Sequence, residues 1–170
     1  MVTFQSVFLP KTISTLCNLA REIQIPYFTP MIGKEQIVYM LDLFLSEAAV
    51  KKSLEQGYQY RLVKYHDEIC GYFAVCPEKD KLFLSKFYLK EEFRGKGIGR
   101  KMMEEVCRLG NGLQSVYLTV NKQNHAPIAA YKALGFSVID SVETDIGNGY
   151  IMDDYIMEKP LISRTLMENV

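Results

Sequence analysis

The amino-acid sequence predicts a mixed α/β (α+β) fold, and three successive patterns along the chain predict it. Apolar residues recur at three- and four-residue spacings over residues 10–57, as they do along one face of an α-helix. Over residues 58–90 apolar and polar residues alternate, which is typical of β-strands. The rest of the chain alternates between the two patterns. We therefore expect a mostly antiparallel sheet with a central β-loop-α-β segment.

The first helix is expected to start at Pro10, directly after a short strand at residues 2–8. Proline suits the first turn of a helix, because its missing N–H group would have no partner there in any case. Pro26 and Pro30, by contrast, predict the end of this helix and an irregular loop over residues 24–31. The aromatic side chains of that loop are expected to be exposed.

Two more helices and a three-stranded antiparallel meander are expected next. The second helix follows Gly33, and Ser46 predicts the N-cap of a third helix that ends at Gly57. Three alternating segments separated by turn residues then predict the strands of the meander, at residues 58–66, 69–75 and 82–89.

The last part of the chain predicts helices and strands in alternation. In order, the patterns predict a helix at 99–110, a strand at 115–120 and a helix at 127–134. Another strand begins with residues 136–139, and a last strand covers about 149–158. No repeat or linker interrupts them. The sequence therefore predicts one domain over residues 1–170, with its core in residues 57–158 and the helices of residues 1–56 on one side.

The composition argues against several classes of function. The chain has 20 basic and 20 acidic residues, so it has no net charge with which to attract nucleic acid or an anionic membrane. No charged-then-apolar leader is visible, and no apolar run approaches the ~20 residues that span a bilayer. We expect a cytoplasmic protein without nucleic-acid or membrane partners.

The cysteines and histidines do not predict a metal site. The four cysteines form no C-x-x-C pair, and the chain has only two histidines to supplement them. All four are expected to act as small apolar side chains, at positions Cys17, Cys70, Cys76 and Cys107.

The most informative segment lies between the third meander strand and the helix that follows it. Its glycines occupy alternate positions, at Gly95, Gly97 and Gly99. Glycine permits positive φ angles and lets a ligand approach the backbone, while the start of a helix presents unpaired N–H groups and a positive dipole end. Basic residues add charge around them, at Arg94, Lys96 and Arg100. The segment therefore predicts a seat for a diphosphate.

Two common phosphate motifs do not fit this segment. A Walker A loop requires a lysine and then a hydroxyl residue after its last glycine, whereas Gly99 is followed by Arg100 and a lysine. The dinucleotide-binding spacing G-x-G-x-x-G is absent as well. A tight strand-to-helix turn with surface basic residues remains the plain structural alternative.

The wider pattern resembles the GNAT superfamily of N-acetyltransferases. Arg94-x-x-Gly97-x-Gly99, after a strand and before an amphipathic helix, resembles the family's acyl-CoA pyrophosphate motif. Downstream, Asn124 and the run Tyr131-Lys-Ala-Leu-Gly135-Phe136 resemble the family's second coenzyme A segment. Upstream, Glu68-Ile-Cys-Gly71-Tyr-Phe resembles the strand before the cofactor-binding one. The resemblance is weak for residues 1–57.

This resemblance implies a fold in which two parallel strands splay apart to receive the pantetheine arm of acetyl-CoA, the co-substrate. Backbone groups of Phe87 and Leu89 would pair with the pantetheine amides, and the Leu89 N–H would also polarise the thioester carbonyl. The loop residues would hold the pyrophosphate, chiefly through N–H groups, and are Arg94, Gly95, Lys96, Gly97, Ile98, Gly99 and Arg100.

The resemblance also implies roles for two residues further along the chain. Asn124 would contact the coenzyme A arm, although the plain alternative is that it caps the next helix. Tyr131 would protonate the departing thiolate, against the alternative of a core aromatic. The stretch Leu84-Ser85-Lys86-Phe87 lacks the carboxylate that many family members use as a base. The candidates for a base or for an anchor of the acceptor are Glu35, Asp42, His125, Asp153 and Asp154, and a bound water or deprotonation of the amine in solvent stays open as an alternative.

The expected acceptor is a primary amine of a small molecule, bound by residues 24–45 and 143–155. Aromatic and acidic residues in the first segment would suit a cationic amine, and they are Tyr27, Phe28, Glu35, Tyr39 and Asp42. The C-terminal sequence resembles that of polyamine acetyltransferases. Two alternatives stay open: a protein N-acetyltransferase, and an acyl-CoA-binding sensor of the same fold without catalysis. Homodimers are frequent in the family, so a homodimer is also compatible.

Overall fold

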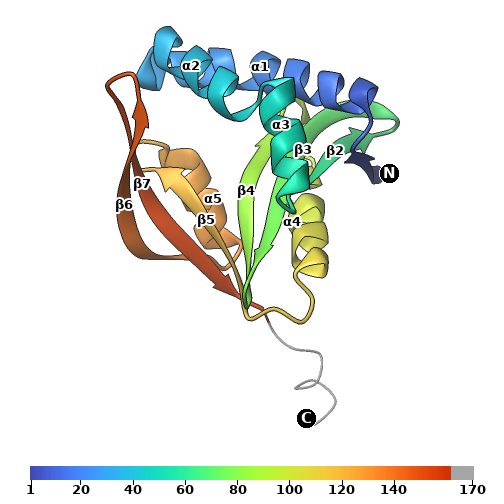
Figure 1. Ribbon diagram of the computed structural model, residues 1–170. Helices are drawn as coiled ribbons and strands as arrows, with labels where there is room; N and C mark the ends of the chain where they lie inside the picture. Colours follow the sequence, from blue (N-terminus) through green and yellow to red (C-terminus); the bar gives the residue numbers. More distant parts are fainter. Residues whose placement is uncertain (162–170) are drawn as a thin grey trace. The chain divides into compact units, whose positions relative to one another are not determined.

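The computed structural model describes residues 1–161 and contains helices and strands in the predicted order. The helices are α1 (Pro10–Ile32), α2 (Lys34–Phe44), α3 (Glu47–Glu55), α4 (Ile98–Leu109) and α5 (His125–Ala133), with a 3-10 turn η1 at Glu91–Phe93 (Figure 1). The strands are β1 (Val2–Val7), β2 (Gln59–Tyr65), β3 (Glu68–Glu78), β4 (Lys81–Leu89), β5 (Ser115–Asn121), β6 (Ser137–Gly147) and β7 (Tyr150–Pro160).

These elements form two compact units. The first unit comprises residues 1–76 and 86–102, and the second comprises residues 77–85 and the described chain from residue 103. The seven strands follow the order β1-β2-β3-β4-β5-β7-β6, with β4 contributing to both units. The predicted mixed α/β fold with a mostly antiparallel sheet is confirmed. The prediction of a single domain over residues 1–170 stays a prediction, and its last nine positions lie outside the described residues.

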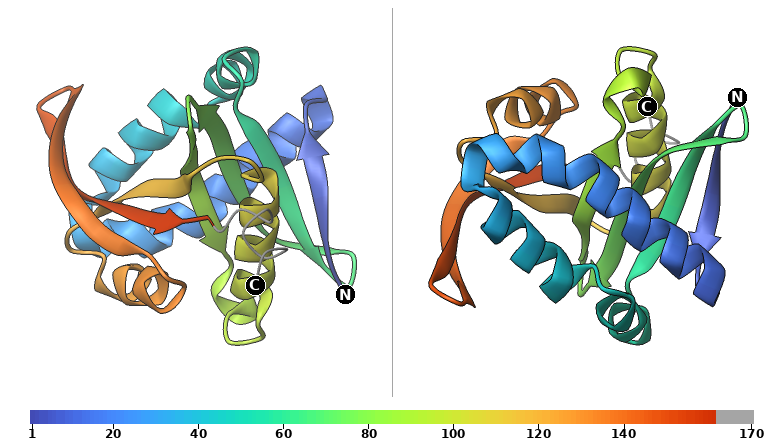
Figure 2. Two further views of the ribbon diagram at one scale, coloured as in Figure 1. Left: turned by 90° about the horizontal axis from the view of Figure 1, so that it is seen from below. Right: turned by 90° about the horizontal axis from the view of Figure 1, so that it is seen from above.

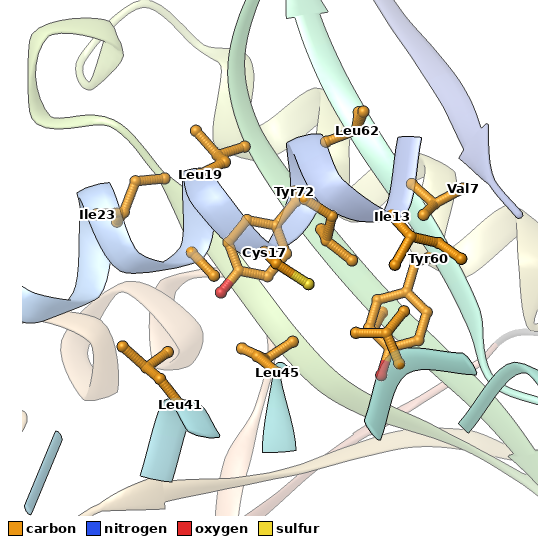
Figure 3. Close-up of a cluster of buried hydrophobic side chains, with 14 of the residues drawn as sticks. Val7, Ile13, Cys17, Leu19, Ile23, Leu41, Leu45, Tyr60, Leu62 and Tyr72 are labelled. Atoms are coloured by element: carbon orange, nitrogen blue, oxygen red, sulfur yellow. The ribbon is translucent and has the colours of Figure 1, made fainter. Parts of the chain in front are cut away.

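In the first unit, α1 runs across the strands β2 and β3 (Figure 2) and packs beside α2. β1 and β2 pair antiparallel, as do β2 and β3, with a bulge between Val63 and Lys64. Buried apolar side chains of α1, α2 and the strands fill the space between them (Figure 3), and Cys17, Leu41 and Tyr72 belong to this cluster. Burial of such side chains is the main force that holds helix to sheet.

The predicted loop at residues 24–31 is wrong, because α1 continues through both prolines to Ile32. Each proline removes one helix hydrogen bond, but packing on the sheet holds the segment helical. Phe28 is 9% exposed, and the buried Gln24 side chain donates a hydrogen bond to the Tyr72 hydroxyl. Tyr27 is half-buried, so neither aromatic residue is freely exposed. Tertiary contacts here outweigh the local preference.

The ends of other helices and strands lie closer to their predicted positions. The Ser46 side chain accepts a hydrogen bond of 3.2 Å from the Ala49 N–H, which confirms the predicted cap of α3. β3 runs through Pro77 to Glu78, beyond the predicted end at residue 75, and the turn that follows contains Lys79 at positive φ. Cys17, Cys70 and Cys76 are buried, as predicted, and Cys107 is half-buried.

The second unit contains the parallel pair of strands. Lys81–Phe83 of β4 pair with Ser115–Tyr117 of β5, and each strand continues past its paired segment. β5 then pairs antiparallel with β7 along its whole length, and β6 and β7 form a long curved hairpin (Figure 1). β6 is the outer strand of the sheet order. This arrangement places α5 directly after the C-terminal end of β5.

Candidate functional site

The predicted phosphate loop connects the end of β4 to the start of α4 in the first unit. Gly95 and Gly97 have φ angles of +74° and +77°, which residues other than glycine rarely adopt. Apart from the neighbouring residues along the chain, no heavy atom of residues 1–161 lies within 4 Å of the position that a Cβ would take at Gly95, Gly97 or Gly99. Glycine-lined backbone therefore faces open space, as a ligand seat requires, rather than the packed interior that the structural alternative would allow.

The first turn of α4 presents its N–H groups at this open surface. Lys101 donates its N–H to the Gly97 carbonyl at 3.3 Å, so the earlier N–H groups of the helix precede the first intrahelical bond. Ile98 is 1% exposed, and its side chain anchors the start of the helix in the core. Of the predicted cofactor residues, Ile98 can therefore offer only its backbone.

Two of the three predicted basic side chains are turned back onto aromatic rings. The Arg94 guanidinium lies 5.6 Å from the centroid of Tyr27 and donates a hydrogen bond of 3.3 Å to the Leu89 carbonyl. Lys96 Nζ lies 5.1 Å from the centroid of Phe93. Such contacts hold a cation through the negative face of the ring. Among residues 1–161, neither side chain forms an ion pair in this conformation.

Arg100 is different from these two residues. It is exposed in the first turn of α4, and among residues 1–161 it forms no ion pair, hydrogen bond or ring contact. A guanidinium in this position can turn toward a phosphate group without breaking an existing contact.

A depression of about 380 Å³ lies beside the loop in the same unit. Its lining comes from α1 and from the segment after β4, and consists of Glu22, Ile23, Pro26, Tyr27, Lys90, Glu91, Glu92 and Arg94. Lys90 is already paired with Glu22 at 3.0 Å. The three glutamates outnumber the two basic residues, so the depression does not suit a diphosphate. The open glycines beside it are the better seat.

The end of β4 is held close to β3 by a glycine. A Cβ at Gly71 would lie 2.4 Å from the Tyr88 carbonyl oxygen and 3.2 Å from the Leu89 Cα. Only a residue without a side chain lets the two backbones approach this closely. Lys90 also donates its N–H to the Cys70 carbonyl at 2.8 Å. These contacts fix the segment that carries Leu89.

Sequence reasoning missed Lys86, the residue before Phe87 on β4. Desolvation lowers the pKa of the Lys86 ammonium to about 8, and its Nζ lies 5.9 Å from the centroid of Phe44 at the end of α2. Burial disfavours a charged amine in this way. The available signal was a charged residue within a mostly apolar strand, and this signal did not reveal the desolvation.

The other predicted cofactor residues, Asn124 and Tyr131, lie in the second unit. Asn124 is 7% exposed and occupies the N-cap position of α5, but its side chain makes no capping hydrogen bond. The Tyr131 ring is half-buried and meets Phe136 edge-on at 5.6 Å. The Phe136 N–H bonds to the Tyr131 carbonyl at 3.0 Å, which fixes the register of this motif. Their roles toward a cofactor stay predictions.

The five candidates for a base differ sharply in environment. Glu35 and His125 are exposed. Asp42 is exposed and paired with Arg21 at 3.2 Å, and the half-exposed Asp153 is paired with Lys122 at 2.8 Å. Asp154 is 5% exposed. It is thus the one buried carboxylate of the five.

No group of three or more potential metal ligands occurs among residues 1–161. Over the same residues, no helix combines the length and apolar character needed to cross a membrane.

Comparison with known proteins identifies relatives of this chain. Residues 19–136 match the model of the acetyltransferase (GNAT) family. A probable N-acetyltransferase of Drosophila melanogaster, san, is 27% identical over 117 residues, which are 64% of this chain and 62% of that protein. A peptidyl-lysine N-acetyltransferase of Salmonella typhimurium, YjaB, is 29% identical over 105 residues, which are 61% and 68% of the two chains. This chain therefore spans less than two thirds of the Drosophila relative.

A solved structure shares the fold over nearly the whole chain. It is a PaiA N-acetyltransferase from Thermoplasma acidophilum in complex with coenzyme A, with a TM-score of 0.79 and 22% identity. The match covers 94% of this chain and 99% of that one.

Proposed function

The chain belongs to the acetyltransferase (GNAT) family, and from that premise we propose that it transfers an acetyl group from acetyl-CoA to a primary amine of a small molecule. The observation that carries the proposal is the open, glycine-lined backbone at the start of α4. Acetyl-CoA supplies the activated acyl group. The residues of this chain bind it, orient the reacting carbonyl and move protons.

The pyrophosphate is proposed to bind the N–H groups of the loop. Gly95, Gly97 and Gly99 leave room for phosphate oxygens, and the start of α4 adds the positive end of the helix dipole. Arg100 supplies a charge that no protein anion neutralises among the described residues. Backbone donors suit a diphosphate because they are fixed and need no ordering when the ligand binds.

The end of β4 is proposed to hold the pantetheine arm. Backbone groups of Phe87 and Leu89 would pair with its amides as an added strand does, and the Leu89 N–H would stabilise negative charge on the thioester oxygen. Arg94 now donates to the Leu89 carbonyl. We expect this guanidinium to move aside when an amide takes its place.

Tyr131 is proposed to protonate the sulfur that leaves. A thiol of pKa ~8.5 departs as the anion, and a phenol of pKa ~10 can donate a hydrogen bond or a proton to it. The edge-on contact between the Tyr131 and Phe136 rings supports this role, because it restricts the orientation of the phenol. The structural alternative is a packing aromatic.

The acceptor is proposed to be a small amine. Tyr27 of α1 lines the depression together with Glu22, Glu91 and Glu92, and an aromatic ring with carboxylates around it suits a cationic amine. A protein acceptor is the second candidate, favoured by the similarity to an enzyme whose name specifies peptidyl-lysine. A sensor without catalysis is the third, and the absence of a carboxylate at residues 84–87 favours it.

Calorimetric titration with acetyl-CoA tests the cofactor before any acceptor is known. The wild-type protein should bind, and Gly99→Ala should bind much more weakly. Gly99 has an ordinary φ and open space at its Cβ position, so this variant should fold normally, and a thermal unfolding scan checks that it does. Failure of the wild-type protein to bind any coenzyme A thioester would overturn the proposal.

Thiol release with a panel of amines then distinguishes the three candidates. The panel contains spermidine, lysine, thialysine and peptides with a free N-terminus or an internal lysine. Turnover of a free amine supports the proposed function, and turnover of peptides alone supports a protein acceptor. For the sensor, acetyl-CoA binds but no amine reacts. In an enzyme, Tyr131→Phe should lower kcat while the affinity for acetyl-CoA is kept.

A further inference from the structure

A buried carboxylate lies near the start of β7 in the second unit. The Asp154 residue is 5% exposed, although aspartate is rarely buried without a partner. Among residues 1–161, its carboxylate makes no hydrogen bond and no ion pair. A buried acid without such partners costs stability, so its retention needs a reason outside packing.

The strand register shows which way this acid lies. Asp154 pairs with Asn121, and Ile156 pairs with Thr119, so these four residues share one face of the sheet. Thr119 is exposed and Ile156 is half-buried. The opposite face carries apolar residues that are buried in the core, such as Leu118. Asp154 is therefore buried on the more open face, at the end of β5 from which α5 begins.

The surroundings of Asp154 keep it ready to accept a proton. The pKa of its carboxyl is raised from 3.8 to about 6, chiefly by desolvation and also by the neighbouring Asp153 charge, while Lys122 acts in the opposite direction. Glu143 pairs with Asp153 across β6 and β7, and Tyr155 follows on the same strand. A carboxylate with a pKa near neutrality suits general base catalysis better than an exposed one.

We propose that Asp154 is the general base that takes the proton from the acceptor ammonium. This inference rests on the proposed function. One proton passes from the ammonium to the carboxylate, and the neutral amine nitrogen then bonds to the acetyl carbon while the carbon–sulfur bond breaks. The nitrogen then gives up a second proton, which replaces at Tyr131 the proton that the phenol donates to the departing thiolate. Asp154 returns its proton to water, which balances the reaction.

The kinetic test compares Asp154→Asn with a matched control, Asp140→Asn on the exposed face of β6. Both changes remove one acidic group. For the best amine of the panel at pH 7, Asp154→Asn should lower kcat by about 100-fold or more, within the range of a lost general base. Its affinity for acetyl-CoA should stay within twofold of the wild type. Asp140→Asn should retain wild-type rates.

The pH profile separates a base from a structural residue. Wild-type kcat/KM should rise with pH through a midpoint near 6, the pKa of the Asp154 carboxyl. In Asp154→Asn this limb should vanish, and the rate should instead climb about tenfold per pH unit as solvent deprotonates an amine of pKa ~10.4. Formate or acetate should partly restore turnover to Asp154→Ala.

A direct titration gives a readout that needs no substrate. Carbon-detected NMR of the wild type should show a carboxyl resonance that titrates near pH 6 and is missing in Asp154→Asn. A midpoint near 4 would contradict the proposal. Rates of Asp154→Asn within threefold of the wild type would also contradict it. A rise in KM alone would contradict it as well, because the Asp154 carboxylate would then anchor the amine without accepting its proton.

The two proposals fail in different ways. If the wild type acetylates no amine of the panel, the proposed function fails, and the role of Asp154 fails with it. If the wild type is active and Asp154→Asn keeps its pH profile, only the role of Asp154 fails.

Discussion

At the scale of single residues, the three basic side chains of the phosphate loop are not equivalent. Arg94 and Lys96 rest on aromatic rings, whereas Arg100 is exposed and makes no such contact with the described residues. To bind Arg94 or Lys96, an anion must break the contact of that side chain with an aromatic ring, whereas Arg100 can bind an anion without losing a contact. Arg100 should therefore contribute most per side chain to electrostatic binding of the diphosphate.

We expect Arg100→Ala to weaken acetyl-CoA binding about tenfold, because a hydrogen bond to a charged group contributes ~1.5–3 kcal/mol and water replaces part of it. The loss should shrink at high salt. Titration calorimetry at two salt concentrations measures both effects. Lys51→Ala removes an exposed positive charge from α3 and should leave the affinity unchanged. Equal losses in both variants would contradict the assignment.

At the scale of elements, α1 shows how far a helix can depart from its local signals. Its two internal prolines each leave a carbonyl group without its usual helix donor. Thr29 Oγ1 donates to the Ile25 carbonyl at 2.5 Å, so a side chain supplies one local contact in this stretch. The helix persists because its buried face packs on the sheet.

We expect Pro30→Ala to raise the free energy of unfolding by about 1 kcal/mol. The exposed site would regain a helix hydrogen bond worth up to ~3 kcal/mol, offset by ~1 kcal/mol of added chain entropy in the unfolded state. Urea denaturation measures the difference. Pro10→Ala is the control, because a first-turn proline breaks no bond and its replacement should bring no gain. A loss of stability in Pro30→Ala would show that the kink itself is needed.

A second expectation concerns the approach of β3 to β4. Gly71→Ala would force a Cβ against the backbone of Tyr88 and Leu89, which cannot yield as a side chain can. It should destabilise the protein by roughly 1–3 kcal/mol, as overpacking does, and weaken acetyl-CoA binding through displacement of Leu89. At Gly110 the nearest atoms belong to the Leu161 and Leu82 side chains, so Gly110→Ala should cost less. Thermal unfolding and calorimetry on both variants make the comparison.

The sequence predicted the element order and the open glycine loop, because both depend on local pattern. Alternation located the meander, and the alternate glycines before α4 located the loop. The continuation of α1 through Pro26 could not be predicted, since it depends on packing against strands of which the next, β2, begins only at Gln59. The same limit applied to Asp154, which the sequence could not distinguish from Asp153. Burial is decided by strands that are distant along the chain.

At the scale of the whole molecule, the buried Asp154 links stability to pH. The folded protein binds this proton more tightly than the unfolded chain does, since the pKa is raised from 3.8 to about 6. Between these values the folded state holds more protons, so stability falls as the pH rises through this window and is constant above it. The charged form costs roughly 3 kcal/mol, at 1.36 kcal/mol per pKa unit over the shift from 3.8 to about 6.

We expect Asp154→Asn to gain stability relative to the wild type as the pH rises from 4 to 7, because the amide cannot ionise. Urea denaturation of both proteins at pH 4, 5, 6, 7 and 8 measures the difference. Asp140→Asn should show no such gain, as the exposed Asp140 lies outside the core. A stability difference that is independent of pH would mean that Asp154 titrates at an ordinary value. A general base that lowers the free energy of unfolding in its charged form is an example of the trade-off between activity and stability.

The outer position of β6 has a consequence for how the purified protein must be handled. An outermost strand offers unused backbone groups to any second chain, and here Val138 and Ile139 are exposed beside them. Asp140, Glu143 and Asp145 stand along the same strand, and their mutual repulsion discourages an identical copy from docking there. Substitutions that remove these charges would therefore favour aggregation that begins at β6.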